Sequence, residues 1–433
     1  MLTGYFKQPP LLASMNKIRI CFFVSIISLH VAGNPYSNAY SILSHQALID
    51  QSWEKSIKPL LKLKYPGSTE DELKVARAYA YGGAIAPDMG YFPFGSVFFT
   101  DLVHYVRSGD FVNALLDEAD SLNEYAFAIG FLCHYNADQY GHHLAINRCV
   151  ALTYPKMEKK YGDLVTYAEN HISHRRIEFS FDVLQTARGK YATQAYHNFI
   201  GFQVSRPILE RAFMRTYGLD LNTVFADLPL AIESFRLSVK NLFPLLTRAA
   251  WVNKRSEISK LNPALRSQDF RYHMRKTDYD HEFGKSGKKP GIFANLLALI
   301  IRVSPKIGPL RVFKFKEPGL AGEKLFVQSF DTALFHFTTT IKLLGSENVN
   351  LTNIDYDTGN LTRAGEYPLT DKNYGILILK LRNKNFVHLN EELKQNILDF
   401  YGNDTSLIIV YKNSRKKKQI NEALDEIKLA KAN

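Results

Sequence analysis

Cysteine is scarce in this chain of 433 residues, with only Cys21, Cys133 and Cys149 present. Cys21 lies in the N-terminal segment, and the other two do not make a disulfide framework. We expect Cys133 to be a small, buried apolar residue. Internal repeats and low-complexity tracts are also missing, and no segment after residue 30 is apolar for long enough to indicate a membrane span. These absences exclude a disulfide-rich scaffold and a repeat protein.

Acidic residues are too few to balance the basic ones. There are 42 Asp and Glu against 54 Lys and Arg, which gives a formal net charge of +12 at pH 7. Residues 1–39 contain three of the basic side chains, Lys7, Lys17 and Arg19, and no acid, so the rest of the chain carries +9. A basic balance suits a phosphate-bearing partner, either a phospholipid surface or a nucleic acid, and does not choose between them.

Residues 1–39 have the features of an export signal. Two basic residues precede the apolar run Ile20–Leu29, which has the length of a signal h-region. Small residues allow cleavage after Gly33 or after Ala39, and the second choice makes Tyr40 the mature N-terminus. No small-residue motif followed by cysteine stands at the end of this segment. We therefore expect an exported protein, periplasmic or secreted, without a lipid anchor.

The rest of the chain predicts an all-α fold. Patterns compatible with helices run through most of residues 40–260, and the 46% hydrophobic content is ordinary for a globular protein. The chain length leaves room for one large domain or two of ordinary size. We expect a first domain at 40–251, a charged linker or extension at 252–290, and a mainly helical C-terminal region at 291–433.

Several segments are open to more than one interpretation. We expect a loop at Gly82–Gly90, because turn residues stand at both of its ends. The apolar runs at Ile376–Leu381 and Leu407–Tyr411 fit short strands and buried helix turns equally well. The run Gly291–Ile301 is expected as a buried core helix, and an interfacial helix with basic flanks is the alternative. The aromatic stretch Tyr91–Phe94 is expected as a core patch rather than the lining of a pocket.

One predicted helix, at about 123–143, carries three candidate metal ligands. His134, Asp138 and His142 stand at positions i, i+4 and i+8, which lie on one face of a helix. Zinc prefers histidine nitrogen and carboxylate oxygen, and a catalytic zinc site keeps one position for water. The spacing therefore predicts a metal site on this helix, and His143 is the alternative to His142.

Five more candidate ligands lie elsewhere in the first 180 residues. His174 and Glu178 repeat the i, i+4 spacing, while His45, Asp88 and His104 each lie in an apolar or aromatic stretch. At about three protein ligands per catalytic zinc, eight side chains are one short of a three-zinc site. The amine and carbonyl of the mature N-terminal residue would supply the missing ligand.

Each of these residues also has an ordinary structural explanation. A single histidine on a helix is commonly a hydrogen-bonded core residue, and a carboxylate four residues away forms a helix-surface pair worth about 0.2–0.5 kcal/mol. Asp88 also follows a proline, where an aspartate commonly shapes a turn. Their joint occurrence, in this order and after an export signal, favours the metal site.

This ordered set resembles the zinc-dependent phospholipase C family, which shares its fold with the fungal single-strand-specific nucleases. In that superfamily the mature N-terminal residue binds zinc through its amine and carbonyl, and a histidine follows a few residues later. Tyr40 and His45 match that pattern, Asp88 matches the loop aspartate, and His104 matches the next ligand. The resemblance covers about residues 40–250 and implies an all-α, multi-helix zinc domain with catalytic function.

The central motif and the final pair match the family with one departure. His134 and Asp138 match the central histidine and the bridging aspartate, and His174 and Glu178 match the last pair. In secreted phospholipases C the third ligand follows the bridging aspartate at a longer spacing, whereas His142 follows after four residues. Relatives that resemble phospholipase D use the shorter spacing, so the departure bears on the substrate rather than on the family.

The resemblance implies two to three zinc ions. One would be held by Asp88, His104, His134 and Asp138, a second by Tyr40, His45 and Asp138, and a third by His142, His174 and Glu178. It further implies that water attacks the phosphodiester and that Asp88 orients or deprotonates this water. No other residue is expected to take a catalytic role.

The expected function is an exported zinc-dependent phosphodiesterase that hydrolyses phospholipid headgroups, as phospholipases C do. A single-strand nuclease or nucleotidase on the same zinc core is one alternative, and a zinc-binding envelope protein without turnover is another. The expected partner is a phospholipid or another phosphodiester, and we expect contact with a membrane surface. Nucleic acid is the alternative substrate. No protein partner is indicated.

Overall fold

A computed structural model describes residues 42–189, 201–239, 251, 254–264, 266, 314–347, 349–402 and 414–431. The export segment, Tyr40 and the apolar runs at Gly291–Ile301 and Leu407–Tyr411 lie outside these residues. Every regular element in the described ranges is a helix, and one isolated antiparallel bridge joins Ile354 to Leu361. The prediction of an all-α fold is confirmed.

The described part of residues 42–239 consists of helices joined by short connections. In chain order they are α2 (Ile42–Ser52), η1 (Trp53–Ile57), α3 (Lys58–Lys64), α4 (Glu70–Ile85), η2 (Ala86–Tyr91), α5 (Val97–Tyr105), α6 (Ser108–Asp117), α7 (Leu122–Gly141), η3 (His142–Ile146), α8 (Asn147–Thr153), α9 (Pro155–Tyr161), α10 (Tyr167–Ala187), α12 (Arg206–Tyr217), η4 (Leu221–Thr223) and α13 (Leu228–Leu237). The remaining described helices are α17 (Gly319–Leu344), α18 (Pro368–Asn383), α19 (Glu391–Tyr401) and α20 (Ser414–Leu429).

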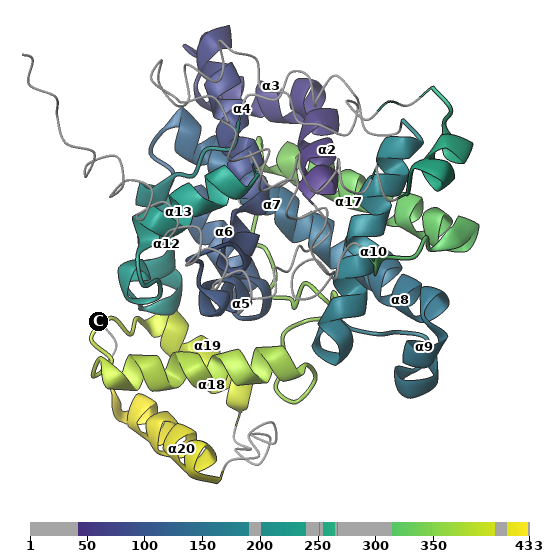
Figure 1. Cartoon of the computed structure of the whole chain (residues 1–433). Coiled ribbons are helices and arrows are strands. Elements are labelled where there is room, and N and C mark those ends of the chain that lie inside the picture. Colours follow the sequence, from purple (N-terminus) through teal and green to yellow (C-terminus); the bar gives the residue numbers. More distant parts are fainter. Residues whose placement is uncertain are drawn as a thin grey trace, which may run out of the picture.

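Helix α7 runs through the middle of the molecule, with α2, α4, α6 and α17 packed around it (Figure 1). It is buried on every side from Tyr125 to Asp138, as expected of a core helix. Its N-terminus is capped by the Ser121 hydroxyl, which accepts a hydrogen bond from the Glu124 backbone N–H at 3.3 Å. Polar side chains on such a helix lie inside the core, so they must find polar or ionic partners there.

Helices α4 and α7 approach each other closely because glycines face each other at their crossing. A Cβ on Gly83 would lie 2.0 Å from the Phe127 carbonyl oxygen, and one on Gly130 would lie 2.2 Å from the Ala80 carbonyl oxygen. The loop predicted for Gly82–Gly90 is therefore wrong in its first part. Gly82–Ile85 continue α4, because close packing on α7 offsets the low helix propensity of glycine, and the 3₁₀ helix η2 follows.

The C-terminal region packs against the same core as the first domain. Helix α17 contacts α7 and η3, and a single cluster of buried apolar residues extends from Ile42 to Ile427. The boundary expected after Trp251 stays a prediction, although described residues on its two sides share one core. Residues 254–261, in the segment expected as a linker, are helical, and the run at 376–381 lies within α18.

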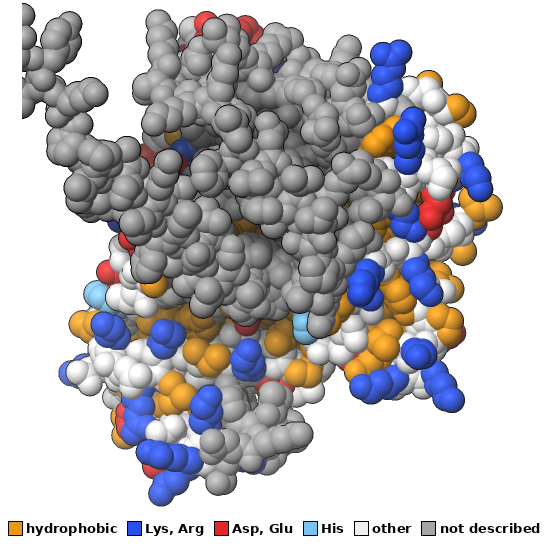
Figure 2. All heavy atoms as spheres, viewed as in Figure 1, with side chains coloured by type: hydrophobic (Ala, Val, Ile, Leu, Met, Phe, Trp, Pro, Cys, Tyr) orange, Lys and Arg blue, Asp and Glu red, His pale blue; other side chains and the backbone are white. Residues whose placement is uncertain are grey.

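The outermost part of the described C-terminal region is formed by α18, α19 and α20, which lie together at one end of the molecule (Figure 1). None of the helices in the described ranges is long and apolar enough to cross a membrane. In the view of Figure 2, the described Lys and Arg side chains are spread over the surface with apolar side chains between them. This face therefore presents no single basic patch among the described residues.

Candidate metal centre

Eight polar side chains predicted from the sequence as ligands meet in the centre of the molecule. All eight are buried, and each is 5% exposed or less. They come from α2, η2, α5, α7, η3 and α10, and they are His45, Asp88, His104, His134, Asp138, His142, His174 and Glu178. The structure groups them in three sets of three, with His134 shared by two: His45, His134 and Asp138; Asp88, His104 and His134; His142, His174 and Glu178.

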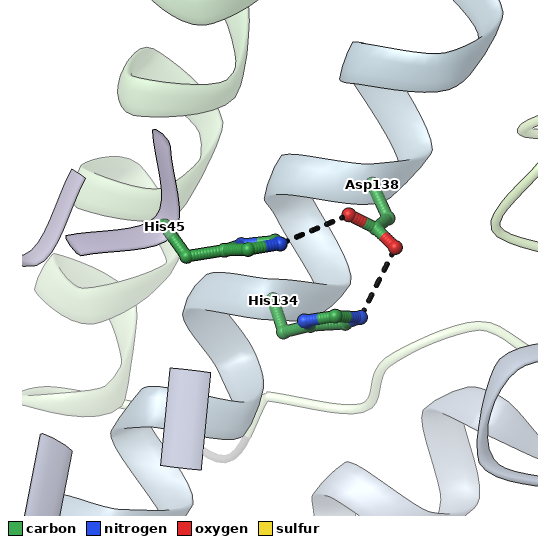
Figure 3. Close-up of side chains that lie close together, drawn as sticks. All are labelled: His45, His134 and Asp138. Carbon is green, nitrogen blue, oxygen red and sulfur yellow. Dashed lines mark ion pairs between the residues drawn. The ribbon is translucent and has the colours of Figure 1, made fainter. Parts of the chain in front are cut away.

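The first set is built on one turn of α7. His134 and Asp138 are four residues apart, and His134 Nε2 lies 3.0 Å from Asp138 Oδ2. His45, on α2, stacks on His134 with ring centroids 4.5 Å apart, and its Nε2 lies 3.4 Å from Asp138 Oδ1. Figure 3 shows the two parallel rings directed at the same carboxylate, one toward each oxygen. Each oxygen of Asp138 therefore faces a different imidazole, an arrangement that would allow the carboxylate to bridge two metal ions.

The second set joins a 3₁₀ turn to helix α5. His104 Nε2 lies 3.5 Å from Asp88 Oδ1 and 3.2 Å from His134 Nε2. The Thr100 hydroxyl holds the turn in place, because it donates to the Pro87 carbonyl at 2.6 Å and accepts from the Gly90 N–H at 2.9 Å. Thr100 and His104 are one helical turn apart, so α5 fixes the histidine and the aspartate together.

The third set lies where α7 ends. His142 is the first residue of the π-helical turn η3, a feature that is frequent at functional sites. His174 Nε2 lies 2.8 Å from His142 Nδ1 and 3.2 Å from Glu178 Oε1. His142 is 5% exposed, whereas the neighbouring His143 is half-buried and outside the three sets.

Charge is shared unevenly within the cluster. Burial raises the pKa of the Asp138 carboxyl, but the imidazoles of His134 and His142 outweigh that effect and hold this pKa well below its usual range. Burial lowers the pKa of His104, but the nearby carboxylates of Asp138 and Asp88 outweigh it and raise this pKa to about 9. The buried carboxylates thus draw positive charge to themselves, as the ligands of a cation do.

These residues fit zinc. Both oxygens of Asp138 and of Glu178, Oδ1 of Asp88 and Nε2 of His142 are buried without a well-oriented hydrogen bond. Leaving such atoms unsatisfied costs about 1–3 kcal/mol each, more for charged groups, unless a cation compensates them. Two atoms bound to one zinc at about 2.0–2.2 Å lie at most about 4.4 Å apart. The nitrogen-to-oxygen distances of 3.0–3.9 Å within the three sets meet that limit.

Tyr40, the predicted N-terminal ligand, lies outside the described residues, so its role stays a prediction. Helix α2 begins two residues later, at Ile42. The start of α2 is tied to α10 by Asp182, whose carboxylate accepts from the Leu43 N–H and the Ser44 hydroxyl, each at 3.2 Å. An acidic partner at a helix N-terminus stabilises the helix dipole. The chain therefore enters α2 beside α10, the helix that carries His174.

Sequence reasoning missed one buried acid at the third set. This residue is Asp357, in the connection between α17 and α18. Its Oδ1 lies 3.3 Å from His142 Nδ1 and 3.9 Å from His174 Nε2. It is separated from His142 by 215 positions, so no local spacing links the two residues. The only available signal is a pair of aspartates, Asp355 and Asp357, in a segment rich in turn residues.

The aromatic stretch after Asp88 is buried beside the cluster. The Tyr91 ring lies 6.4 Å from that of Tyr167, and the Phe92 ring packs edge-on against Phe235 at 5.0 Å. Phe92 belongs to the main apolar core. Cys133 and Cys149 are both free and buried, which agrees with the expectation that Cys133 is a small core residue.

Comparison with known protein families gives a match that covers the residues that carry the eight candidate ligands. Residues 44–227 match the family model described as zinc dependent phospholipase C. This part of the chain belongs to the zinc-dependent phospholipase C family, as the ligand order indicates. No curated protein and no solved structure matches the chain. The match ends before residue 228, so the segment that carries Asp357 lies outside it.

The family match supports a phospholipase C-like hydrolase with zinc dependence for this part of the chain. The three sets of buried ligands are the part of the structure that can hold the metal. All eight side chains of those sets fall within the matched residues 44–227.

Proposed function

We propose that the chain is an exported zinc-dependent phosphodiesterase that hydrolyses the headgroup phosphodiester of phospholipids. The observation that carries the proposal is the convergence of the eight ligand side chains, from six elements, in one buried cluster within the family match. The basic net charge agrees with an anionic, phosphate-bearing substrate.

The ligand sets divide in a way that suits two or three ions. Asp138 contacts imidazoles of both the first and the second set, because His104 Nε2 lies 3.6 Å from Asp138 Oδ2. One carboxylate can therefore serve two neighbouring ions, with the third set forming a separate site. Zinc held there would supply Lewis-acid stabilisation of the negative charge that develops on the phosphoryl oxygens and would make water a nucleophile at neutral pH.

The chain's own chemistry in this reaction is proton transfer at Asp88. Its carboxylate is buried, and Oδ1 makes no well-oriented hydrogen bond. Burial also raises its pKa above the usual aspartate range, which makes it a better base than an exposed carboxylate. Asp88 accepts a proton from the attacking water, the new P–O bond forms, and the P–O bond to glycerol breaks. The glycerol oxygen takes a proton from solvent, so diacylglycerol leaves as the alcohol, and Asp88 returns its proton to solvent. The phosphorylated headgroup is the second product.

The test combines zinc analysis with a choice of substrates. The full chain, exported so that its own leader is removed, is analysed for zinc and for its N-terminal residue, and is then offered phosphatidylcholine micelles and single-stranded DNA. We expect two to three zinc ions, Tyr40 as the first residue, and release of phosphocholine from the micelles. Cleavage of DNA alone would assign the nuclease alternative, and zinc without turnover of either substrate would assign a non-catalytic envelope protein.

A substitution at Asp88 tests the mechanism separately from metal binding. Asp88→Asn keeps the shape of the side chain and removes its basicity, so hydrolysis should fall by about 10²–10⁴-fold, the usual contribution of a general base. Zinc content should stay close to that of the wild type, because His104, His134 and Asp138 remain. Wild-type turnover in this variant would contradict the role of Asp88 as base.

A further inference from the structure

We propose that Asp357, in the C-terminal region, positions His142 for metal binding by accepting a hydrogen bond from His142 Nδ1–H. The inference rests on the proposed function, since it takes His142 as a zinc ligand. It assigns a role to a residue outside the segment that matches the family, and it makes the C-terminal region part of the metal centre.

The segment that carries Asp357 is fixed against the first domain by backbone contacts. The Tyr356 N–H donates to the His104 carbonyl at 3.1 Å, and the Asn147 side-chain amide donates to the Asp357 carbonyl at 2.8 Å. The Tyr356 ring packs against the rings of His104 and His134, with centroids 5.2 and 5.8 Å away. Asp357 is therefore held through its neighbour Tyr356, which contacts the proposed ligand His104, and through its own carbonyl, which contacts Asn147.

The carboxylate of Asp357 is oriented by two donors on one oxygen. Its Oδ2 accepts from the Tyr167 backbone N–H at 2.8 Å and from the Tyr367 hydroxyl at 2.6 Å. The side chain is 1% exposed, so water does not take the place of these donors. With Oδ2 held in this way, Oδ1 faces His142 Nδ1 at 3.3 Å.

Two other histidines of the cluster show the same arrangement of their ring nitrogens. His104 Nδ1 lies 2.8 Å from the Thr100 carbonyl, and His134 Nδ1 lies 2.9 Å from the Ala84 carbonyl. A carbonyl only accepts, so Nδ1 carries a proton in each ring, and Nε2 is the nitrogen that faces the cluster and would give its lone pair to a metal.

His142 completes the pattern with a carboxylate in place of a carbonyl. Its Nε2 lies 3.5 Å from Asp138 Oδ2 and 3.9 Å from Glu178 Oε1, and it makes no well-oriented hydrogen bond. His174 Nε2 lies 2.8 Å from the same Nδ1 and competes with Asp357 for its proton. The charged carboxylate is the stronger acceptor, and zinc at the third set would occupy the His174 lone pair.

Asp357→Asn provides the sharpest test, because the two tyrosine donors decide how the amide lies. The Tyr167 N–H and the Tyr367 hydroxyl require an oxygen at the Oδ2 position, so the amide NH₂ must face His142. His142 Nδ1 then becomes an acceptor and Nε2 carries the proton, which must be displaced before Nε2 can bind a metal. We expect the third site to bind zinc about 10–100-fold more weakly, the usual cost of losing such a partner.

Zinc alone is the probe, and the full exported chain is used throughout. Chelator competition gives the affinity of each site, and spectra of ¹⁵N-labelled histidine in the zinc-loaded protein give the tautomer of His142. Tyr367→Phe removes one of the two donors and should cause a smaller loss of affinity. In a His142→Ala background, Asp357→Asn should have no further effect, because its action passes through that ring.

Asp355→Asn is the matched control. Asp355 is also buried, lies two residues earlier in the same segment, and accepts from the Thr358 N–H at 2.7 Å within that segment. Wild-type zinc affinity in Asp357→Asn, an unchanged His142 tautomer, or an equal loss in Asp355→Asn would overturn the proposal and leave the proposed function standing. A wild-type chain that binds no zinc would overturn both, and that result appears before any variant is made.

Discussion

Two adjacent histidines at the end of α7, His142 and His143, have very different surroundings although they are one position apart. His142 lies within 4 Å of polar atoms of Asp138, Glu178 and Asp357, while His143 is half-buried with its Cβ 3.3 Å from the position of a Cβ on Gly359. The π-helical turn begins at His142, and this local widening of the helix sets the direction of both side chains.

Alanine substitutions at these neighbours should separate their roles. His142→Ala should lower the zinc content of the full chain by about one ion, because a site left with two protein ligands falls short of the three that zinc usually needs. His143→Ala is the matched control and should leave the zinc content unchanged. Elemental analysis after dialysis is the measurement, and equal zinc content in the two variants would contradict the assignment.

At the scale of the element, the crossing of α4 and α7 decides where the central ligands lie. The facing glycines bring the Ala84 carbonyl within 2.9 Å of His134 Nδ1, so the helix contact and the orientation of the imidazole have one cause. A wider crossing would move α4 away from His134 and leave its Nδ1–H without this acceptor, at a cost of about 1–3 kcal/mol.

Gly83→Ala should destabilise the protein. The new Cβ would lie 2.0 Å from the Phe127 carbonyl oxygen, so the two helices would have to separate. Overpacking of this kind costs about 1–3 kcal/mol in the free energy of unfolding, which urea denaturation measures. Gly67→Ala is the control, because nothing lies within 4 Å of the added Cβ. If the two variants had equal stability, the close crossing would not be required.

At the scale of the whole molecule, the candidate metal centre is where residues of the first domain and of the C-terminal region meet. Residues 350–357 contact α6 and α7: the Tyr135 hydroxyl donates to the Thr352 carbonyl at 2.9 Å, and the Asp110 N–H to the Asn353 side chain at 3.0 Å. Candidate ligands from six elements and a buried acid from the C-terminal region converge in this place. Their negative charge is balanced in part by imidazoles, and zinc would complete that balance.

Removal of zinc should therefore lower the thermal midpoint of the whole chain. A ligand present at 1,000 times its Kd contributes about 4 kcal/mol to the free energy of unfolding, so the loss of even one such site is large. The measurement is thermal unfolding with and without EDTA, and EDTA saturated with zinc beforehand is the control. An unchanged midpoint after chelation would contradict a structural contribution of the metal.

The sequence by itself determined the helical class and the identity of the eight clustered side chains. The reason is local geometry: residues four apart on a helix share a face, so His134 with Asp138 and His174 with Glu178 could be paired without coordinates. Ligand order along the chain then indicated the family, which the match over residues 44–227 bears out.

Only the tertiary structure decided what depends on packing between distant segments. It placed Asp357 against His142 across 215 positions, and it supplied the carbonyls that orient His104 and His134. It also made Gly82–Ile85 helical, because contact with α7 outweighed the turn preference of the glycines. Such contacts follow from the way whole helices fit together in three dimensions, and neither spacing nor propensity along the chain encodes them.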